Sequence, residues 1–145
     1  MPISDFDRYF SDAAIESDQV GPADSGTVAV STAGSPTSVA ATFPLDAQGN
    51  QTSLNRIKWI LTIFGLAGGG TIGTINLTAN DGLGHNQTIA SYAAPVAPAV
   101  ELELEGAATI TGLTQLKNFV TLTASIVMAG GGGTGSARLR MLGNQ

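Results

Sequence analysis

The sequence predicts an all-β protein, an antiparallel β-sandwich or jelly roll of about eight short strands. Two observations favour this class. Short segments alternate between apolar and polar residues with a period of two, and Gly, Pro and Asn residues separate them. Between these segments the sequence shows no stretch of helical length and helical period, which argues against a parallel α/β sheet.

The first predicted strands run from residue 27 to residue 79. Residues 27–34 are rich in β-branched side chains, and residues 38–45 place four apolar side chains on one face. Residues 56–64 alternate Ile, Trp and Leu with Arg, Lys and Thr. Residues 71–79 continue this alternation, with Thr and Asn on the polar face.

The later predicted strands are equally short. Residues 87–94 end before a proline, and residues 100–106 alternate almost purely between Glu and Leu. The pattern of residues 109–116 is ambiguous. Residues 118–128 and 136–142 alternate again, and their apolar faces complete the expected core.

The sequence predicts two parts, an acidic, aromatic arm, residues 1–25, and a β-sandwich domain, residues 26–145. Ser4 and Asp7 fit a helix start. The arm is expected to be a short helix or an extended segment that packs on its own sandwich or docks on a neighbouring chain. The linker-like stretch SDQVGPADSG favours the neighbour. Candidate partner-binding residues are Asp5, Phe6, Asp7, Arg8, Tyr9 and Phe10.

Charge and composition exclude several classes of function. The formal net charge is −5. The excess acid lies in residues 1–24, so neither part has the basic patch that nucleic-acid binding requires. The absence of cysteine excludes disulfides and thiolate metal sites. We expect no membrane span, because no apolar run is long enough, and no signal peptide, hence a cytoplasmic product.

Two glycine-rich stretches, LAGGGTIGTINL and MAGGGGTGSARL, raise the question of a dinucleotide site. Their glycines fit G-x-G-x-x-G at Gly68, Gly70 and Gly73 and at Gly130, Gly132 and Gly135. A phosphate site needs a helix after the last glycine, and both stretches lead into strand patterns. We therefore expect two hairpin loops and no cofactor.

Candidate catalytic residues are few. His85 is the only histidine of the chain, and with Asp81 nearby it reads as a solvated turn residue. Glu101, Glu103 and Glu105 lie about 7 Å apart along one strand face, a spacing that glycosidases also use. These glutamates are better explained as residues of a solvent-exposed strand face, or as charges that prevent unwanted strand pairing at a sheet edge. We expect no enzyme and no metal site.

The same glutamates are candidate contact residues. They can meet basic side chains across strands or across a subunit boundary. The possible subunit contacts are Arg56, Lys58, Glu101, Glu103, Glu105, Arg138 and Arg140.

The acidic-aromatic arm MPISDFDRYF, followed by a neutral sandwich with AGGGT, AGGGGTG and VTLTASIVM, resembles small structural proteins of tailed-phage virions. Capsid decoration or cement proteins are the nearest type. The resemblance implies a virion protein, often trimeric, that binds at junctions between major capsid subunits and stabilises the shell. Phe6, Tyr9 and Phe10 would then anchor the arm. Alternatives are a tail, fibre or other virion β-domain, and a carbohydrate-binding jelly roll.

Overall fold

A computed structural model describes residues 19–43, 56–81, 84–94, 101–111 and 121–144 of the chain. These residues form nine strands and contain no helix. The strands are β1 (Gln19–Asp24), β2 (Val28–Ser31), β3 (Thr37–Thr42), β4 (Arg56–Ala67), β5 (Thr71–Asn80), β6 (Asn86–Tyr92), β7 (Glu101–Thr109), β8 (Thr121–Ala129) and β9 (Thr134–Asn144).

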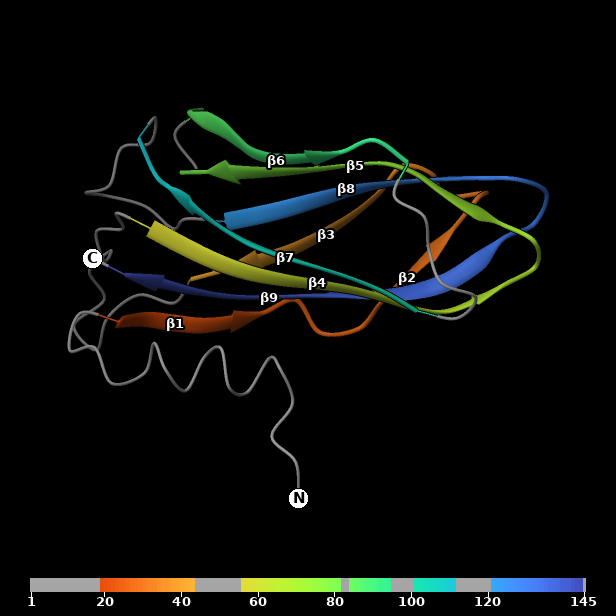
Figure 1. The fold of residues 1–145 in the computed structure, drawn as a ribbon, viewed down its shortest axis with the longest axis horizontal. Helices are drawn as coiled ribbons and strands as arrows, with labels where there is room; N and C mark the ends of the chain where they lie inside the picture. The colour runs from red at the N-terminus through yellow and green to blue at the C-terminus, as the bar shows by residue number, and fades with distance from the viewer. Residues whose placement is uncertain (1–18, 44–55, 82–83, 95–100, 112–120, 145) are drawn as a thin grey trace, which may run out of the picture.

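The strands form two antiparallel sheets that face each other (Figure 1). Sheet A has the order β1-β9-β4-β7, and β2 pairs with β9 beyond the end of β1. Sheet B has the order β3-β8-β5-β6. The predicted all-β sandwich is confirmed.

The strand order is that of a jelly roll. Since β1 and β2 pair with consecutive parts of β9, they act as one interrupted edge strand. Counting them together leaves eight strands. The first then pairs with the eighth, the second with the seventh, the third with the sixth and the fourth with the fifth. This nesting of antiparallel pairs defines the double Greek key of jelly rolls.

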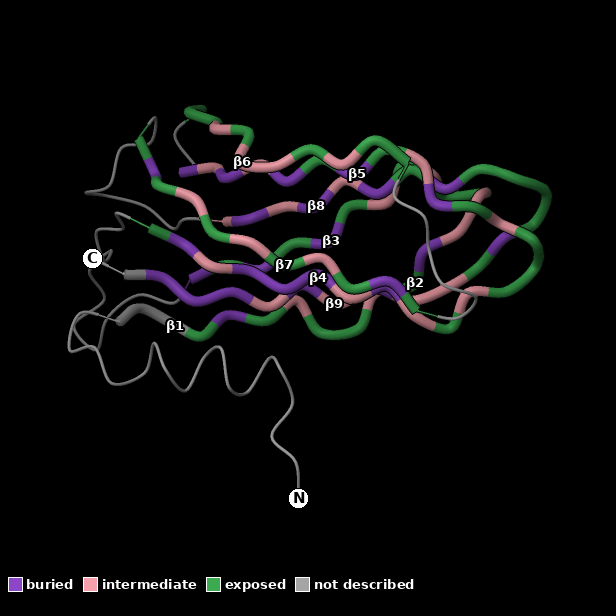
Figure 2. The backbone as a smooth tube through the Cα atoms, in the orientation of Figure 1, coloured by how far each residue is buried: buried purple, intermediate pink, exposed green. Residues whose placement is uncertain are grey.

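The core lies between the two sheets and is built mainly by alternation of buried and exposed residues along the strands (Figure 2). In β8, for example, Leu122, Ala124 and Ile126 are buried, while Thr121 and Thr123 face outward. Trp59, the single tryptophan of the sequence, packs in the same core. The buried side chains described are apolar with the single exception of Asp81.

The sandwich begins earlier in the chain than the predicted boundary at residue 26. Residues 19–24 form β1, which pairs with β9, so this part of the linker-like stretch belongs to sheet A. Pro22 fits because it lies in a register irregularity between Val20 and Ala23 on an edge strand, where a missing backbone donor is tolerated. Residues 1–18, including the expected helix, lie outside the described residues, as does most of 109–116.

The glycine-rich loops are not hairpins, so that prediction is wrong. Each connects one sheet to the other: residues 68–70 join β4 of sheet A to β5 of sheet B, and residues 130–133 join β8 of sheet B to β9 of sheet A. We call these two loops the glycine arches. They lie side by side at one end of the sandwich (Figure 1), because β4 pairs with β9 and β5 with β8 up to their bases.

The glycines of the two arches allow a close backbone approach. A Cβ atom on Gly133 would lie 2.3 Å from Cα of Gly70, and one on Gly68 would lie 2.3 Å from the carbonyl oxygen of Gly132. Gly68 also has a φ of 73°, which side-chain-bearing residues rarely adopt. Each arch therefore requires glycine because of the other arch.

Candidate functional site

The outer face of sheet A gathers almost all the charge of the described residues. Nine acidic or basic residues lie in the described ranges, and eight of them occupy this face. Four are acidic and four are basic, so their formal charges cancel. We call this set the charged face: Asp24, Arg56, Lys58, Glu101, Glu103, Glu105, Arg138 and Arg140.

Strand β7 supplies the acidic row of the charged face. Its three glutamates, Glu101, Glu103 and Glu105, are all exposed, because they alternate with Leu102 and Leu104, which face the core. Among the described strands, β7 pairs only with β4 and forms the edge of sheet A. A row of carboxylates on an edge strand opposes unwanted strand addition.

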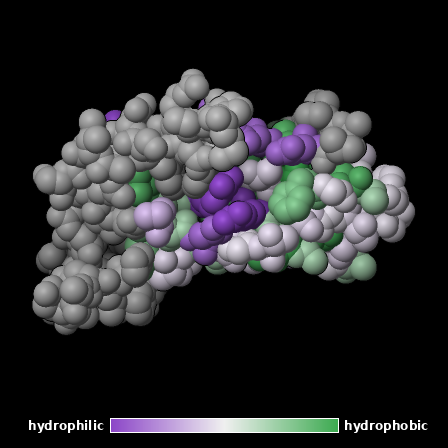
Figure 3. Space-filling view, turned by 90° about the horizontal axis from the view of Figure 1, so that it is seen from below, coloured by the Kyte–Doolittle hydropathy of each residue, from purple (hydrophilic) through white to green (hydrophobic). Residues whose placement is uncertain are grey.

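Strands β4 and β9 supply the basic residues. Arg138 stands in line with Thr62 of β4 and Glu103 of β7. Arg140 is in line with the next row of the sheet, two residues further along each strand. The β7 glutamates and the β9 arginines are thus two strands apart, about 10 Å, whereas Arg56 and Lys58 lie on β4, the strand next to β7. Seen from below, hydrophilic residues gather in the middle of the molecule's described surface (Figure 3).

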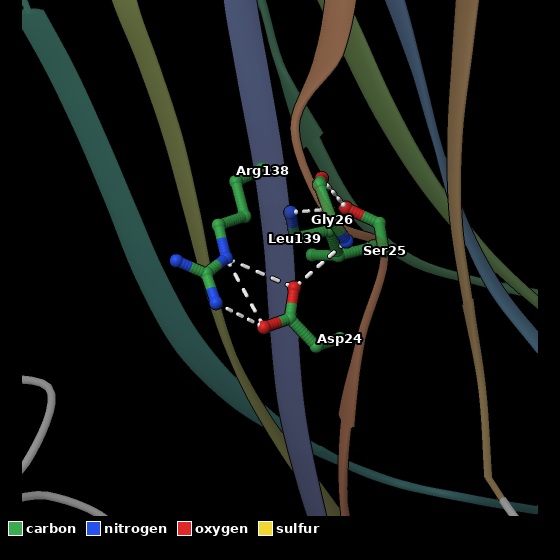
Figure 4. A network of polar contacts seen from close by, with 5 residues as sticks. All are labelled: Asp24, Ser25, Gly26, Arg138 and Leu139. Atoms are coloured by element: carbon green, nitrogen blue, oxygen red, sulfur yellow. Dashed lines mark hydrogen bonds and ion pairs between the residues drawn. The ribbon is translucent and has the colours of Figure 1, made fainter.

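Asp24 and Arg138 form an ion pair at the edge of this face (Figure 4). Nε of Arg138 donates to Oδ1 of Asp24 over 3.0 Å, and the backbone N–H of Gly26 donates to the same oxygen over 2.8 Å. The hydrogen bond from the Arg138 guanidinium lowers the pKa of the Asp24 carboxyl below its ordinary value. Both side chains remain partly exposed, so the pair is a surface ion pair.

The residue after Asp24 fixes the interruption between β1 and β2. The backbone N–H of Ser25 donates to the carbonyl oxygen of Leu139 over 2.9 Å. The backbone N–H of Leu139 in turn donates to the Ser25 hydroxyl over 2.9 Å (Figure 4). These two bonds hold Asp24 beside β9 and thereby position it for Arg138.

The outer face of sheet B has a different chemistry. Its positions, which we call the neutral face, carry hydroxyl, amide or methyl side chains, and the exposed Val127 of β8 lies on the same side of the sheet. The positions of the neutral face are Ser38, Ala40, Thr42, Asn76, Thr78, Asn80, Asn86, Thr88, Ser91, Thr121, Thr123 and Ser125. Several hydrogen-bond to each other across strands, as Thr42 does with Thr121 over 2.8 Å and Ser91 with Asn76 over 2.6 Å. This face therefore offers hydrogen-bonding groups and no charge.

The ninth charged residue, Asp81, is buried at the end of β5. Its side chain is 0% exposed. It accepts a hydrogen bond from the backbone N–H of His85 over 3.1 Å, and Oδ2 lies 2.7 Å from Nδ1 of the His85 ring. That ring is 53% exposed. The expected turn histidine is thus partly solvated and held by a buried carboxylate, which closes the connection from β5 toward β6.

Within the described ranges, no three His, Cys, Asp or Glu side chains are grouped so that they could hold a metal ion. In the same ranges there is no helix long and apolar enough to cross a membrane.

The structure places the predicted contact residues of the sandwich together on the charged face. The predicted arm residues, Asp5, Phe6, Asp7, Arg8, Tyr9 and Phe10, lie outside the described residues. Sequence reasoning missed Asp24 as a member of the site, because its partner Arg138 is 114 residues away. It also missed the neutral face, whose signal is the repeated Thr and Asn on the polar side of residues 71–79 and 118–128.

No protein-family model matches the chain, and no curated protein matches it. Among solved structures, the chain is similar to a chain of the tripod (BppUct-A-L) from the baseplate of bacteriophage Tuc2009, with 12% sequence identity and a TM-score of 0.42. The match covers 83% of this chain and 46% of the tripod chain. The chain therefore spans about half the length of the solved chain that it resembles.

Proposed function

We propose that this chain is a non-enzymatic structural protein of a tailed-phage particle. In its finer form, the proposal is a capsid decoration protein that binds at junctions between major capsid subunits and stabilises the shell. Assembly as a trimer belongs to the same proposal. The observation that carries it is the sorting of charge, with eight charged residues on one outer face and the neutral face opposite.

Separated rows of opposite charge suit a protein partner. A subunit surface that carries the reverse order of charges would pair with both rows at once, which fixes the register of docking and speeds association. Because the face carries equal numbers of acids and bases, it does not attract a uniformly charged partner such as nucleic acid. Of the predicted contacts, Arg56, Glu101 and Glu103 are exposed on this face and are the residues that such a partner would meet.

The buried groups also support a structural role. Asp81 is the buried charged side chain among the described residues, and its oxygens are engaged by His85. A general acid or base needs a group that can reach a substrate, and this carboxylate closes a turn instead. Stabilisation through buried contact area requires no reactive group.

The test is binding to purified heads of the phage that encodes the chain, prepared without decoration protein. Wild type is compared with the variant Glu101→Lys/Glu103→Lys/Glu105→Lys in a sedimentation assay. Reversal of the acidic row should weaken binding by at least about tenfold, equivalent to about 1.4 kcal/mol. Wild-type binding should also weaken as salt is raised.

The matched control places three lysines on the opposite side of the sandwich, as Ser38→Lys/Ala40→Lys/Thr88→Lys. These positions are exposed, so the control should fold, which thermal melting checks, and should bind heads like wild type. Equal loss of binding in both variants would contradict a role for charge sorting. Binding to isolated tails or to a neutral glycan, with no binding to heads, would contradict the decoration role itself.

A further inference from the structure

Two apolar residues on the outer face of sheet A break the alternation of their strands. Along β4, Trp59, Ile60 and Leu61 are buried in succession, although alternation points the middle one outward. Along β9, Met141 and Leu142 are both buried. Ile60 is 0% exposed and Leu142 2% exposed, yet neither belongs to the core between the sheets. Something therefore covers this part of the outer face.

The two residues are close enough to form one patch. Lys58 is the β4 residue directly opposite Leu142, and Ile60 is the next outward residue along β4. They are diagonal neighbours on adjacent strands, within reach of each other's side chains. We call this pair, Ile60 and Leu142, the outer apolar patch.

The charged side chains around the patch do not explain its complete burial. Glu105, directly beside Ile60 on β7, is exposed. Arg140, on the other side of Ile60, is partly buried, and its Nε atom is fully buried. The hydroxyl of Thr62, the next outward residue of β4, is buried as well. The shielded area thus extends beyond the two apolar residues, as under a covering segment.

We infer that residues 1–18 fold back over their own sandwich and cover the outer apolar patch. Their chain enters the sheet at Gln19, which pairs with Asn144, two residues beyond Leu142 on the same strand. The patch on β4 lies two strands from β1, about 10 Å. Eighteen residues span about 27 Å even as a helix, which is more than enough.

Two other segments at this end of the sandwich, where β1 begins, are connections between the two sheets. Residues 44–55 connect β3 of sheet B to β4 of sheet A, and residues 112–120 connect β7 of sheet A to β8 of sheet B. Each has to pass from one sheet to the other. Residues 1–18 have no such crossing to make before β1, so they can lie along the outer face of sheet A.

The side chains of residues 1–18 match the patch in polarity and charge. Phe6, Tyr9 and Phe10 have the i, i+3, i+4 spacing of one helical face and supply apolar area. The segment contains five acidic residues and one basic residue, a formal charge of −4. The patch is bordered by Lys58 and Arg140 on β4 and β9 and by Glu105 on β7, so its neighbours are two basic residues and one acidic residue. An aromatic centre with an acidic surround therefore meets an apolar centre whose neighbours are mainly basic.

Burial within a single chain favours the chain's own segment over that of a neighbour. Ile60 and Leu142 are covered in the isolated chain, whereas docking on a second copy would leave them exposed there. This reverses the preference that the linker-like stretch suggested from sequence. The inference does not rest on the virion role and stands if that role is wrong.

The test uses a spin label and methyl NMR on the full chain. The chain has no cysteine, so Ser11→Cys provides a single site for a nitroxide next to Phe10. The label should broaden the methyl signals of Ile60 and Leu142 and leave those of Val127, on the outer side of sheet B, unchanged. No broadening at Ile60 would overturn the inference.

A mixed sample distinguishes the chain's own segment from that of a second copy. Isotope-labelled chain without nitroxide is combined with unlabelled chain that carries it. The Ile60 and Leu142 signals should then stay sharp, and broadening in this sample would overturn the inference. As a second measurement, Phe6→Ala/Phe10→Ala should shift the Ile60 methyl resonance, while that of Ile75 in the core stays in place.

Discussion

The two outer faces of the sandwich belong to strands with the same alternation of inward and outward side chains. They differ in the chemistry of the outward side chains. Sheet A presents eight charged residues and a covered apolar patch, and sheet B presents hydroxyls, amides and methyls. The inward sides of both sheets are apolar and share one core. Folding therefore sets no demand that would place the charges on one sheet.

This contrast indicates which outer face has a role beyond folding. Exposed ion pairs contribute little to stability, typically less than about 1 kcal/mol. Eight charges in opposed rows are thus poorly explained by the stability of the sandwich alone. A face that is recognised by another protein explains their arrangement, and a neutral face with satisfied hydrogen-bonding pairs is suited to remain in water.

The largest effect should come from the glycine arches, which join the sheet of the charged face to the sheet of the neutral face. In Gly133→Ala the new methyl group would collide with the backbone of Gly70, and we expect a loss of about 3 kcal/mol in unfolding free energy. Urea denaturation measures it. The control Gly131→Ala, whose Cβ meets nothing within 4 Å, should lose nothing. Equal stability of both variants would show that the arches do not touch.

The second-largest loss of stability is expected at Asp81, a charged residue at the end of β5 that is buried and not exposed. In Asp81→Ala both carboxylate oxygens are removed, so the backbone N–H of His85 loses its buried acceptor and the His85 ring loses its partner. We expect a loss of about 2 kcal/mol at neutral pH by chemical denaturation. Thr88→Ala, an exposed change on the same sheet, should stay within about 0.5 kcal/mol of wild type. If the two variants lose equally little, the buried pair has no structural role.

A smaller, pH-dependent effect is expected for Asp24 on the charged face. Its pKa is lowered by Arg138 in the folded protein from an ordinary value of 3.8, so the stabilisation is present above that pH and is lost as the pH falls through the folded pKa. Since both partners are partly exposed, Asp24→Asn should cost at most about 1 kcal/mol at pH 7. The difference from wild type should vanish in strong acid. A difference that persists there would assign the effect to packing.

The smallest effect should come from the hydroxyl pairs of the neutral face. A double-mutant cycle of Thr42→Val and Thr121→Val isolates the hydrogen bond between the two side chains. We expect a coupling of about 0.5 kcal/mol, typical of cross-strand pairs. A coupling above that of Asp24 with Arg138, measured in the same way, would reverse the ranking of the two faces.

Local sequence patterns predicted the strands but not their connections. In the segment 118–128, alternation predicts that Leu122, Ala124 and Ile126 are buried, and they are. Alternation can be read from the sequence because it depends only on the strand itself. The glycine arches were predicted as hairpins, since a loop between two alternating strands looks the same whether it returns within a sheet or crosses to another. Asp24 was assigned to the arm because Gly21 and Pro22 are typical of a linker, and only the pairing with β9 makes that stretch a strand.

The amino-acid sequence alone determines that the chain is all-β and which side of each strand is apolar. It also determines that the chain has no cysteine and no basic patch. Which strands would be neighbours was settled by folding. Asp24, the β7 glutamates and Arg138 lie far apart in the sequence, and hydrogen bonding of β1, β4 and β7 in one sheet with β9 brings them onto one surface. The physical reason is that alternation depends on adjacent residues, whereas strand order depends on which distant segments satisfy each other's backbone and enclose a common core.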